Sequence, residues 1–181
     1  MRKGLLIWVT LIGIATVMSC KPTVKASDES TPVDKVKQDK DGTISLKVEK
    51  ASTYRDMDNP SSNTAEWNVV VSKSGRFNVW LSSATKDTTD LKYKNSVLLS
   101  IRDNRIEKRP GCDKIIQNSS DVSYPYFRAD SFMGSLYIQD TGLINVQIIS
   151  EKIVTENGKV NGNSTPENSK LLSVFLTPAT R

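Results

Sequence analysis

The chain has 181 residues and a formal net charge of +5, with no histidine. This length suggests one domain with appendages. The lack of histidine removes the imidazole base and the histidine metal ligands of many enzymes, and interspersed charges without a basic block argue against a nucleic-acid partner.

The first residues have the layout of a lipoprotein signal peptide, expected at 1–19. Arg2 and Lys3 provide the positive start, and an apolar run over 5–17 has secretory length but is short for a membrane span. The run ends in VMSC at 17–20, which resembles the bacterial lipobox. We therefore expect cleavage before Cys20 and a membrane anchor through lipid on its thiol. The alternatives are a plain signal peptide or an uncleaved anchor helix.

Residues 20–41 are predicted to form a lipidated, flexible tether. From 21 onward this stretch has no aromatic residue, leucine or isoleucine, so it cannot bury enough surface to offset its ordering entropy. Lys21 follows the cysteine where aspartate commonly marks inner-membrane retention, which favours the outer membrane of the cell envelope. With Cys20 lipidated, Cys112 has no disulfide partner.

From 42 to 181 the apolar residues recur with a period of two, which is typical of half-buried strands. The alternating positions are Ile44, Leu46, Val48, Trp67, Val69, Val71, Phe77, Val79, Leu81, Val97, Leu99, Ile101, Leu136, Ile138, Ile144, Val146, Ile148, Leu172, Val174 and Leu176. No stretch has convincing helical periodicity. The pattern predicts an all-β domain over 42–181, an antiparallel β-sandwich.

Turns that contain glycine separate some of these alternating runs. Lys73-Ser74-Gly75 and Asp140-Thr141-Gly142 each separate two alternating runs, so each is predicted to close a tight hairpin. Two segments, 107–130 and 154–170, are long and polar. Loops of that length in a compact domain are usually either functional or disordered.

The tryptophans on two adjacent predicted strands differ in their expected positions. Trp67 alternates in phase with Val69 and Val71, so it is predicted to enter the core. Trp80 lies on the opposite face of its strand from Val79 and Leu81, where it could line a concave sheet face or pack under a loop.

A further aromatic cluster lies in the loop at 123–128. Pro125 stiffens this loop, and a stiff aromatic loop loses little entropy when a ligand stacks on it. The predicted ligand-binding residues are Tyr124, Tyr126, Phe127, Arg128 and Asp130, with Asn161 and Asn163 from the second polar segment. The other interpretation is that the three rings plug one end of the sandwich.

Catalysis is not expected, and neither a metal nor a cofactor is expected. Asp56 and Asp58 are neighbours, but beside Asn59 they are more typical of a turn than of a glycosidase pair. The same two aspartates and Glu49 are candidate calcium ligands, for which solvated charges are the favoured interpretation.

The stretches EWNVVV at 66–71 and SGRFNVW at 74–80 resemble the central hairpin of galactose-binding-like β-sandwich domains. These include the family 6 and family 35 carbohydrate-binding modules and accessory domains of bacterial glycosidases. The resemblance implies a jelly-roll fold and non-catalytic binding of a glycan or polysaccharide at the cell envelope. The alternative is a structural or interaction subunit that docks another envelope protein.

Such domains commonly hold a structural calcium between glutamates of the first strand and an aspartate of the last. Lys47 and Ser173 stand at two of those positions, and Glu49 remains. The resemblance therefore implies that folding does not require calcium.

Overall fold

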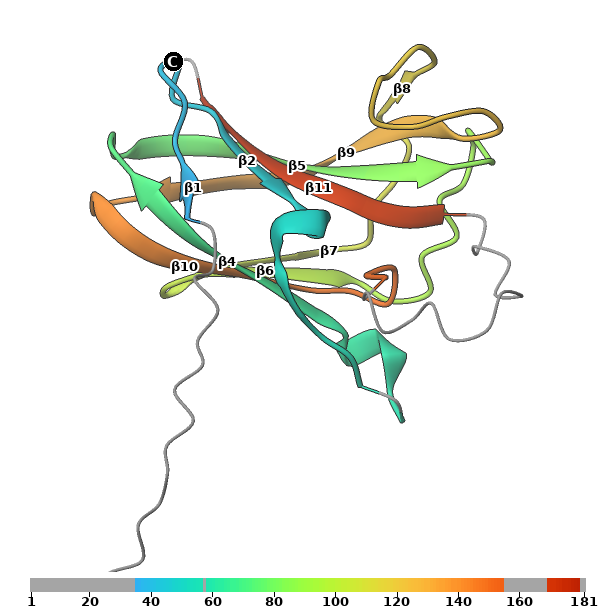
Figure 1. Cartoon of the computed structure of the whole chain (residues 1–181), viewed down its shortest axis with the longest axis horizontal. Coiled ribbons are helices and arrows are strands. Elements are labelled where there is room, and N and C mark those ends of the chain that lie inside the picture. The colour runs from blue at the N-terminus through green and yellow to red at the C-terminus, as the bar shows by residue number, and fades with distance from the viewer. Residues whose placement is uncertain (1–34, 57, 155–168, 180–181) are drawn as a thin grey trace, which may run out of the picture. The chain divides into compact units, whose positions relative to one another are not determined.

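A computed structural model describes residues 35–56, 58–154 and 169–179 (Figure 1). Within these ranges the chain forms strands and two short 3-10 turns, and no helix among them is long and apolar enough to cross a membrane. The strands are β1 Val36–Lys37, β2 Ile44–Lys47, β3 Ser52–Tyr54, β4 Thr64–Val71, β5 Gly75–Thr85, β6 Val97–Ile101, β7 Asn104–Lys108, β8 Lys114–Ile116, β9 Phe127–Ile138, β10 Gly142–Ile149 and β11 Ser169–Pro178. The 3-10 turns are η1 Val48–Lys50 and η2 Pro60–Ser62.

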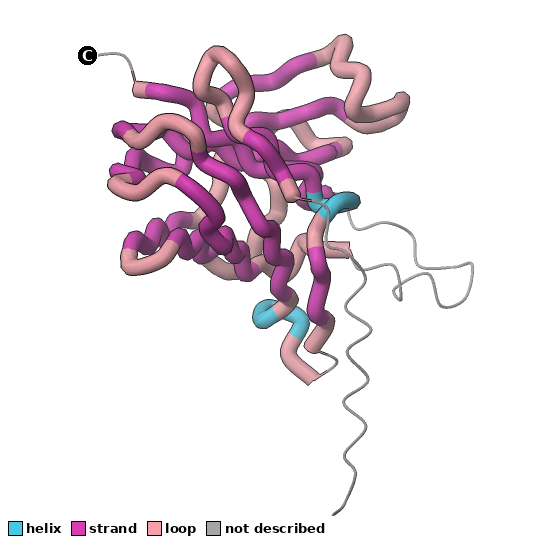
Figure 2. The backbone as a smooth tube through the Cα atoms, turned by 60° about the vertical axis from the view of Figure 1, so that its left-hand side comes forward, coloured by secondary structure: helices cyan, strands magenta, loops and turns pink. Residues whose placement is uncertain are grey.

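The strands form two sheets packed face to face, which confirms the predicted β-sandwich (Figure 1). The six-stranded sheet has the order β1-β4-β10-β6-β7, with β3 also on β4. The five-stranded sheet has the order β2-β11-β5-β9-β8. All pairs are antiparallel except β1 with β4. Strands and loops make up nearly all of the described backbone (Figure 2).

The core lies between the two sheets and contains nearly all of the alternating positions that the sequence indicated. Trp67 is 1% exposed, as predicted, and its indole Nε1 donates a hydrogen bond to the Lys47 carbonyl at 2.8 Å. This bond ties β4 of one sheet to β2 of the other. Leu91 and Tyr93 also enter the core, although they belong to no strand.

The two predicted hairpins are wrong, although both turns are present. The turn at 72–74 joins β4 to β5, and the turn at 139–141 joins β9 to β10, and in each case the two strands belong to different sheets. Alternation determines which side of a strand faces inward, but it does not determine which strand pairs with it. Gly142 has φ of +99°, a backbone conformation that glycine adopts without strain at this crossing.

The predicted core position Leu172 is only half-buried, and Leu171 is buried instead. The pairing of β11 with β5 shifts between Leu171 and Ser173, and such a bulge reverses the side-chain phase along the strand. Beyond the bulge, Val174 and Leu176 are buried as expected.

The sandwich begins before the predicted boundary at residue 42, because Val36 of β1 pairs with Val69 of β4. Strands of two or three residues, such as β1, β3 and β8, have too few alternating positions to be recognised from sequence. Strand β8 and the beginning of β9 lie within the polar segment 107–130. The predicted signal peptide and Cys20 lie outside the described residues.

Candidate functional site

Three aromatic side chains form a row across the outer face of the five-stranded sheet. Trp80 lies between the buried residues Val79 and Leu81 of β5, so its side chain faces outward. In the sheet register Trp80 pairs with Phe175 of β11 on one side and with Phe132 of β9 on the other. All three are half-buried. We call Phe175, Trp80 and Phe132 the aromatic row.

The rings of Trp80 and Phe132 are in contact, with centroids 5.1 Å apart and planes inclined by 53°. A bulge in β9 places Phe132 on this face, because the pairing with β5 shifts between Val79 and Trp80. The extra residue, Met133, is buried. Phe132 can therefore face outward before the bulge and Ser135 after it.

Polar side chains border the aromatic row on one side. Asn78 precedes Trp80 by two residues and pairs with Thr177 and Ser135. The Ser135 hydroxyl donates to Asn78 Oδ1 at 2.6 Å, which orients the amide. Asn78 Nδ2 donates to no residue within the described ranges, so two N–H donors face the solvent beside Trp80. We call Thr177, Asn78 and Ser135 the polar row.

A charged cluster borders the aromatic row on the other side. Arg128 Nε donates to Asp130 Oδ1 at 2.8 Å and Nη2 donates to Oδ2 at 3.1 Å, a two-pronged pair. Its Nη1 donates to Asp121 Oδ2 at 2.9 Å, and its guanidinium carbon lies 4.8 Å from the centre of the Phe175 ring. Burial alone lowers the pKa of Arg128, but Asp130 and then Asp121 outweigh burial and raise that pKa above its ordinary value.

Ser82 of β5 lies beside this cluster, paired with Ser173 of β11 on one side and with Asp130 of β9 on the other. It is 1% exposed, and its hydroxyl has no hydrogen-bond partner in the part of the chain that the structure describes. Buried polar groups are normally hydrogen-bonded, to ordered water where no protein group is available.

The predicted loop residues do not form one stacking surface. Tyr124 is 92% exposed, which contradicts the interpretation that all three rings plug the sandwich. Tyr126 lies under Lys86, whose Nζ is 5.1 Å from the ring centre. Phe127 is half-buried and is two residues from buried Ala129, so it faces the core side of β9. The structure brings Arg128 and Asp130 together, whereas Asn161 and Asn163 lie outside the described residues.

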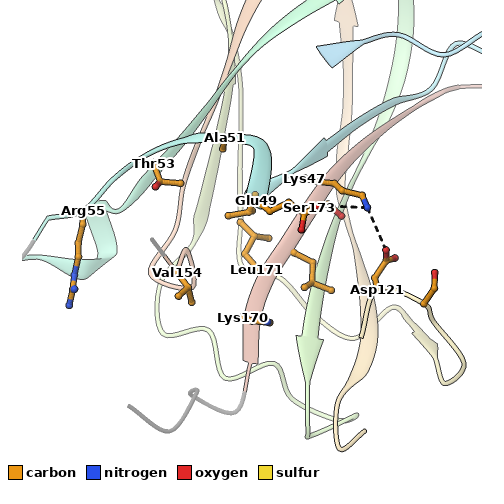
Figure 3. Close-up of a pocket in the computed structure, with 13 residues that line it drawn as sticks. Lys47, Glu49, Ala51, Thr53, Arg55, Asp121, Val154, Lys170, Leu171 and Ser173 are labelled. Atoms are coloured by element: carbon orange, nitrogen blue, oxygen red, sulfur yellow. Dashed lines mark ion pairs between the residues drawn. The ribbon is translucent and has the colours of Figure 1, made fainter. Parts of the chain in front are cut away.

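A cavity of about 770 Å³ adjoins the charged cluster at one end of the sandwich (Figure 3). It is lined by residues of β2, η1, β3 and β11 and by the loop that carries Asp121, and no aromatic residue is among the described lining residues. Lys47 Nζ lies 3.9 Å from a carboxylate oxygen of Glu49 and 4.0 Å from one of Asp121. The cavity therefore offers charged groups but no ring on which a sugar could stack.

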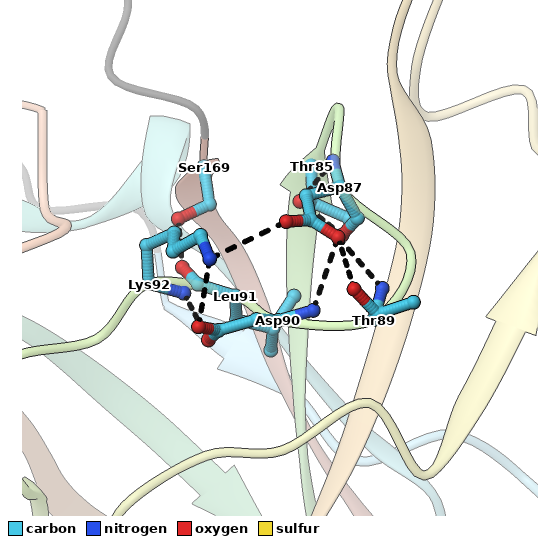
Figure 4. A network of polar contacts seen from close by, with 7 residues as sticks. All are labelled: Thr85, Asp87, Thr89, Asp90, Leu91, Lys92 and Ser169. Atoms are coloured by element: carbon cyan, nitrogen blue, oxygen red, sulfur yellow. Dashed lines mark hydrogen bonds and ion pairs between the residues drawn. The ribbon is translucent and has the colours of Figure 1, made fainter.

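A second polar network, around Asp87, has a structural role (Figure 4). Asp87 Oδ1 accepts hydrogen bonds from the Thr89 hydroxyl and from the backbone N–H groups of Thr89 and Asp90. The Thr89 hydroxyl and N–H lower the Asp87 pKa to about 2. Lys92 lies 2.9 Å from Asp90 and 3.5 Å from Asp87. These contacts shape the loop that carries Leu91 into the core.

Calcium removal is expected to leave stability unchanged. Lys47 of β2 pairs with Ser173 of β11, and its ammonium lies between the carboxylates of Glu49 and Asp121, where it repels a divalent cation. Asp56 Oδ1 accepts hydrogen bonds from the backbone N–H groups of Asp58 and Asn59, which is a turn-forming role. No group of three metal-ligating side chains occurs among the residues described. Excess EGTA should shift the melting temperature by less than about 2 °C. A large drop that calcium reverses would contradict this expectation.

The fold and the outer face together define a β-sandwich domain with an aromatic surface on one sheet. No protein-family model and no curated protein sequence matches the chain. Among solved structures, the α-L-fucosidase from Vibrio sp. strain EJY3 is 19% identical, with a TM-score of 0.59 over 79% of this chain and 24% of that one. The GH26-CBM35 β-(1,4)-mannanase of Podospora anserina is 11% identical, with a TM-score of 0.43 over 78% and 28%. The likeness to the fucosidase shows a shared fold, and this chain spans about a quarter of that enzyme's length.

Proposed function

We propose that this domain binds a carbohydrate without catalysing a reaction on it, through the outer face of the five-stranded sheet. The observation that carries the proposal is the aromatic row, three half-buried rings on neighbouring strands of the outer face of the five-stranded sheet. Aromatic faces provide the flat apolar surface on which the C–H face of a sugar ring packs. A binding site of this kind combines apolar surface with a few placed polar groups.

The groups beside the aromatic row suit the hydroxyls of a sugar. The Asn78 amide provides donors on one side, and the partly exposed side chains of Arg128 and Asp121 provide donors and acceptors on the other. Both sets are held in place by protein contacts, since Ser135 orients Asn78 and two carboxylates hold Arg128. A surface ordered before binding loses little entropy when a ligand arrives.

The loop at 117–126 belongs to the proposed site as its border. Asp121 connects this loop to Arg128 beside the aromatic row. The sequence prediction that Tyr124, Tyr126 and Phe127 bind the ligand remains a prediction, and Tyr124 is the ring of this loop with the most exposed surface.

The proposal is non-catalytic because the candidate reactive groups are engaged or unactivated. Asp121 and Asp130 are both paired with Arg128. Burial, followed by the charges of Asp87 and Asp90, raises the pKa of the Cys112 thiol, which disfavours the nucleophilic thiolate. We further propose, from the sequence, that lipid on Cys20 holds the domain at the cell envelope, with the outer membrane favoured.

Trp80→Ala tests the proposed function. We expect the non-lipidated chain from residue 21 to bind at least one glycan of a broad array, and the variant to bind it at least about tenfold more weakly, because the central ring of the row is lost. Tyr137→Ala is the matched control. Tyr137 is 55% exposed on the same face but lies outside the row, so its removal should leave binding unchanged.

Calorimetric titration gives the affinities, and the melting temperature of each variant checks its folding. Tyr124→Ala, measured in parallel, reports whether the loop contributes to binding. If the parent chain binds no glycan, the proposal is wrong and the interaction subunit for another envelope protein takes its place. If Trp80→Ala binds as tightly as the parent, the site lies elsewhere.

A further inference from the structure

We infer that the ligand is a linear glycan that lies across strands β11, β5 and β9 and is bound along its interior, over about three sugar units. This inference rests on the proposed function and specifies the class of ligand. It follows from the direction of the aromatic row, from the polar groups along both of its sides and from its open ends.

The aromatic row is longer than a single sugar requires. Its three residues lie on three neighbouring strands, in one line perpendicular to them. Neighbouring strands are about 4.8 Å apart, so the row extends about 10 Å from Phe175 to Phe132. One pyranose ring is about the size of one aromatic ring and covers one position. A chain of sugars in extended form places successive rings over successive positions.

The inclined ring planes of Trp80 and Phe132 suit a chain of several sugars better than a single rigid sugar ring. Their 53° angle means that two adjacent sugars stack on both rings only if the sugars are turned relative to one another. Units of a glycan chain can turn in this way about their glycosidic bond, whereas a single rigid ring cannot follow both planes.

Hydrogen-bonding groups accompany the row along both sides. On one side Thr177, Asn78 and Ser135 belong to the same three strands as the aromatic residues, one row further along the sheet. On the other side the corresponding positions, Ser173, Ser82 and Asp130, are buried, and the polar groups that reach the surface there are the paired side chains of Arg128 and Asp121. An extended glycan exposes hydroxyls at both of its edges, and the polar row on one side and the Arg128–Asp121 pair on the other match this distribution.

The row is open at both ends. Beyond Phe175 the next position in the register is Ser45 of β2, a small side chain. Beyond Phe132 no further strand continues the sheet in the described residues, because β8 pairs only with the positions from Arg128 to Asp130. Two exposed polar side chains lie at that end. Asp113 Oδ2 accepts a hydrogen bond from the Phe132 N–H at 2.7 Å, and Lys108 Nζ donates to the Phe132 carbonyl at 2.6 Å and lies 5.7 Å from the centre of its ring. A chain can therefore continue past both ends, unlike in a pocket that encloses a chain terminus.

Affinity as a function of ligand length tests this inference. The probes are cello-, xylo-, manno- and laminari-oligosaccharides of one to six units, titrated calorimetrically into the chain from residue 21. For the series that binds, we expect affinity to rise about tenfold with each unit up to three and then to level off. Chemical reduction of the terminal sugar of the six-unit ligand should leave its affinity unchanged, because the interior of the chain is bound.

Variants at the end of the row give the second test. Phe175→Leu keeps an apolar side chain but removes the flat ring, so affinity should level off at two units. Phe175→Ala should do the same and serves as the second variant if either one lowers the melting temperature. Tyr137→Ala, outside the row, should keep the length dependence of the parent chain.

The outcomes separate this inference from the proposed function. Equal affinity for one unit and for six, or loss of binding on reduction of the terminal sugar, overturns the linear-glycan inference while glycan binding itself stands. Binding that levels off at three units in the parent and at two in the Phe175 variants supports it. An absence of binding to all four series and to the glycan array overturns both.

Discussion

Replacement of Trp67 by alanine is expected to lower the free energy of unfolding by about 3–5 kcal/mol, the usual range for a buried large aromatic side chain. The Trp67 indole is almost fully enclosed between the sheets, and its strand is central, with β10 paired along its whole length. The variant also loses the hydrogen bond from Nε1 to the Lys47 carbonyl. Urea denaturation followed by circular dichroism measures the change.

Two further variants separate the causes of this loss. Trp67→Phe keeps an aromatic ring but removes the indole N–H, so the Lys47 carbonyl loses its partner at a cost of about 1 kcal/mol in addition to the smaller cavity. Trp80→Ala removes a side chain of the same size from the outer face and should cost much less, because that ring is only half-buried. A loss below about 1 kcal/mol in Trp67→Ala would mean that the core collapses into the space the indole leaves.

The sequence predicted which residues face the core because burial imposes a period of two on each strand. Trp67, Val79 and Val146 are buried as their phase indicated. Pairing between strands has no comparable local signal. The turn before Gly75 therefore looked like a hairpin, although it carries the chain from one sheet to the other. A bulge leaves no local signal either, so Leu172 was assigned to the core where Leu171 is buried.

The candidate site was only partly predictable. Trp80 was assigned to the face opposite the core. Phe175 lies between Val174 and Leu176, which are buried, so alternation predicts an outward position for Phe175 as well. The sequence could not predict that these residues are neighbours, because Phe132 and Phe175 pair with Trp80 through the register of strands that are far apart in sequence. The loop around Tyr124 was prominent because its aromatic residues are close in sequence, although their rings diverge in the fold.

Arg128→Met is expected to destabilise the domain by about 3 kcal/mol, because it leaves a carboxylate in a poorly hydrated place without its partner. Asp130 is 8% exposed, and both of its oxygens accept hydrogen bonds from Arg128. One of its two neighbours in the register, Ser82, is itself without a hydrogen-bond partner among the described residues, and the other is the exposed Lys114 of β8. Chemical denaturation at pH 7 measures the loss.

A double-mutant cycle distinguishes the pair from its surroundings. Asp130→Leu combined with Arg128→Met removes both charges and fills the space with apolar atoms, so the double variant should recover most of the stability lost in Arg128→Met alone. Arg128→Lys keeps the charge without the two-pronged geometry and should lose an intermediate amount. Asp121→Asn weakens only the more exposed ion pair of Arg128, the one with Asp121, and should cost at most about 1 kcal/mol. If the double variant is instead no more stable than Arg128→Met, the unpaired Asp130 carboxylate is not the cause of the loss, and the contact of Arg128 with Phe175, which both variants lack, accounts for it. Arg128 would then hold the Phe175 ring of the aromatic row in place, in addition to pairing with Asp130.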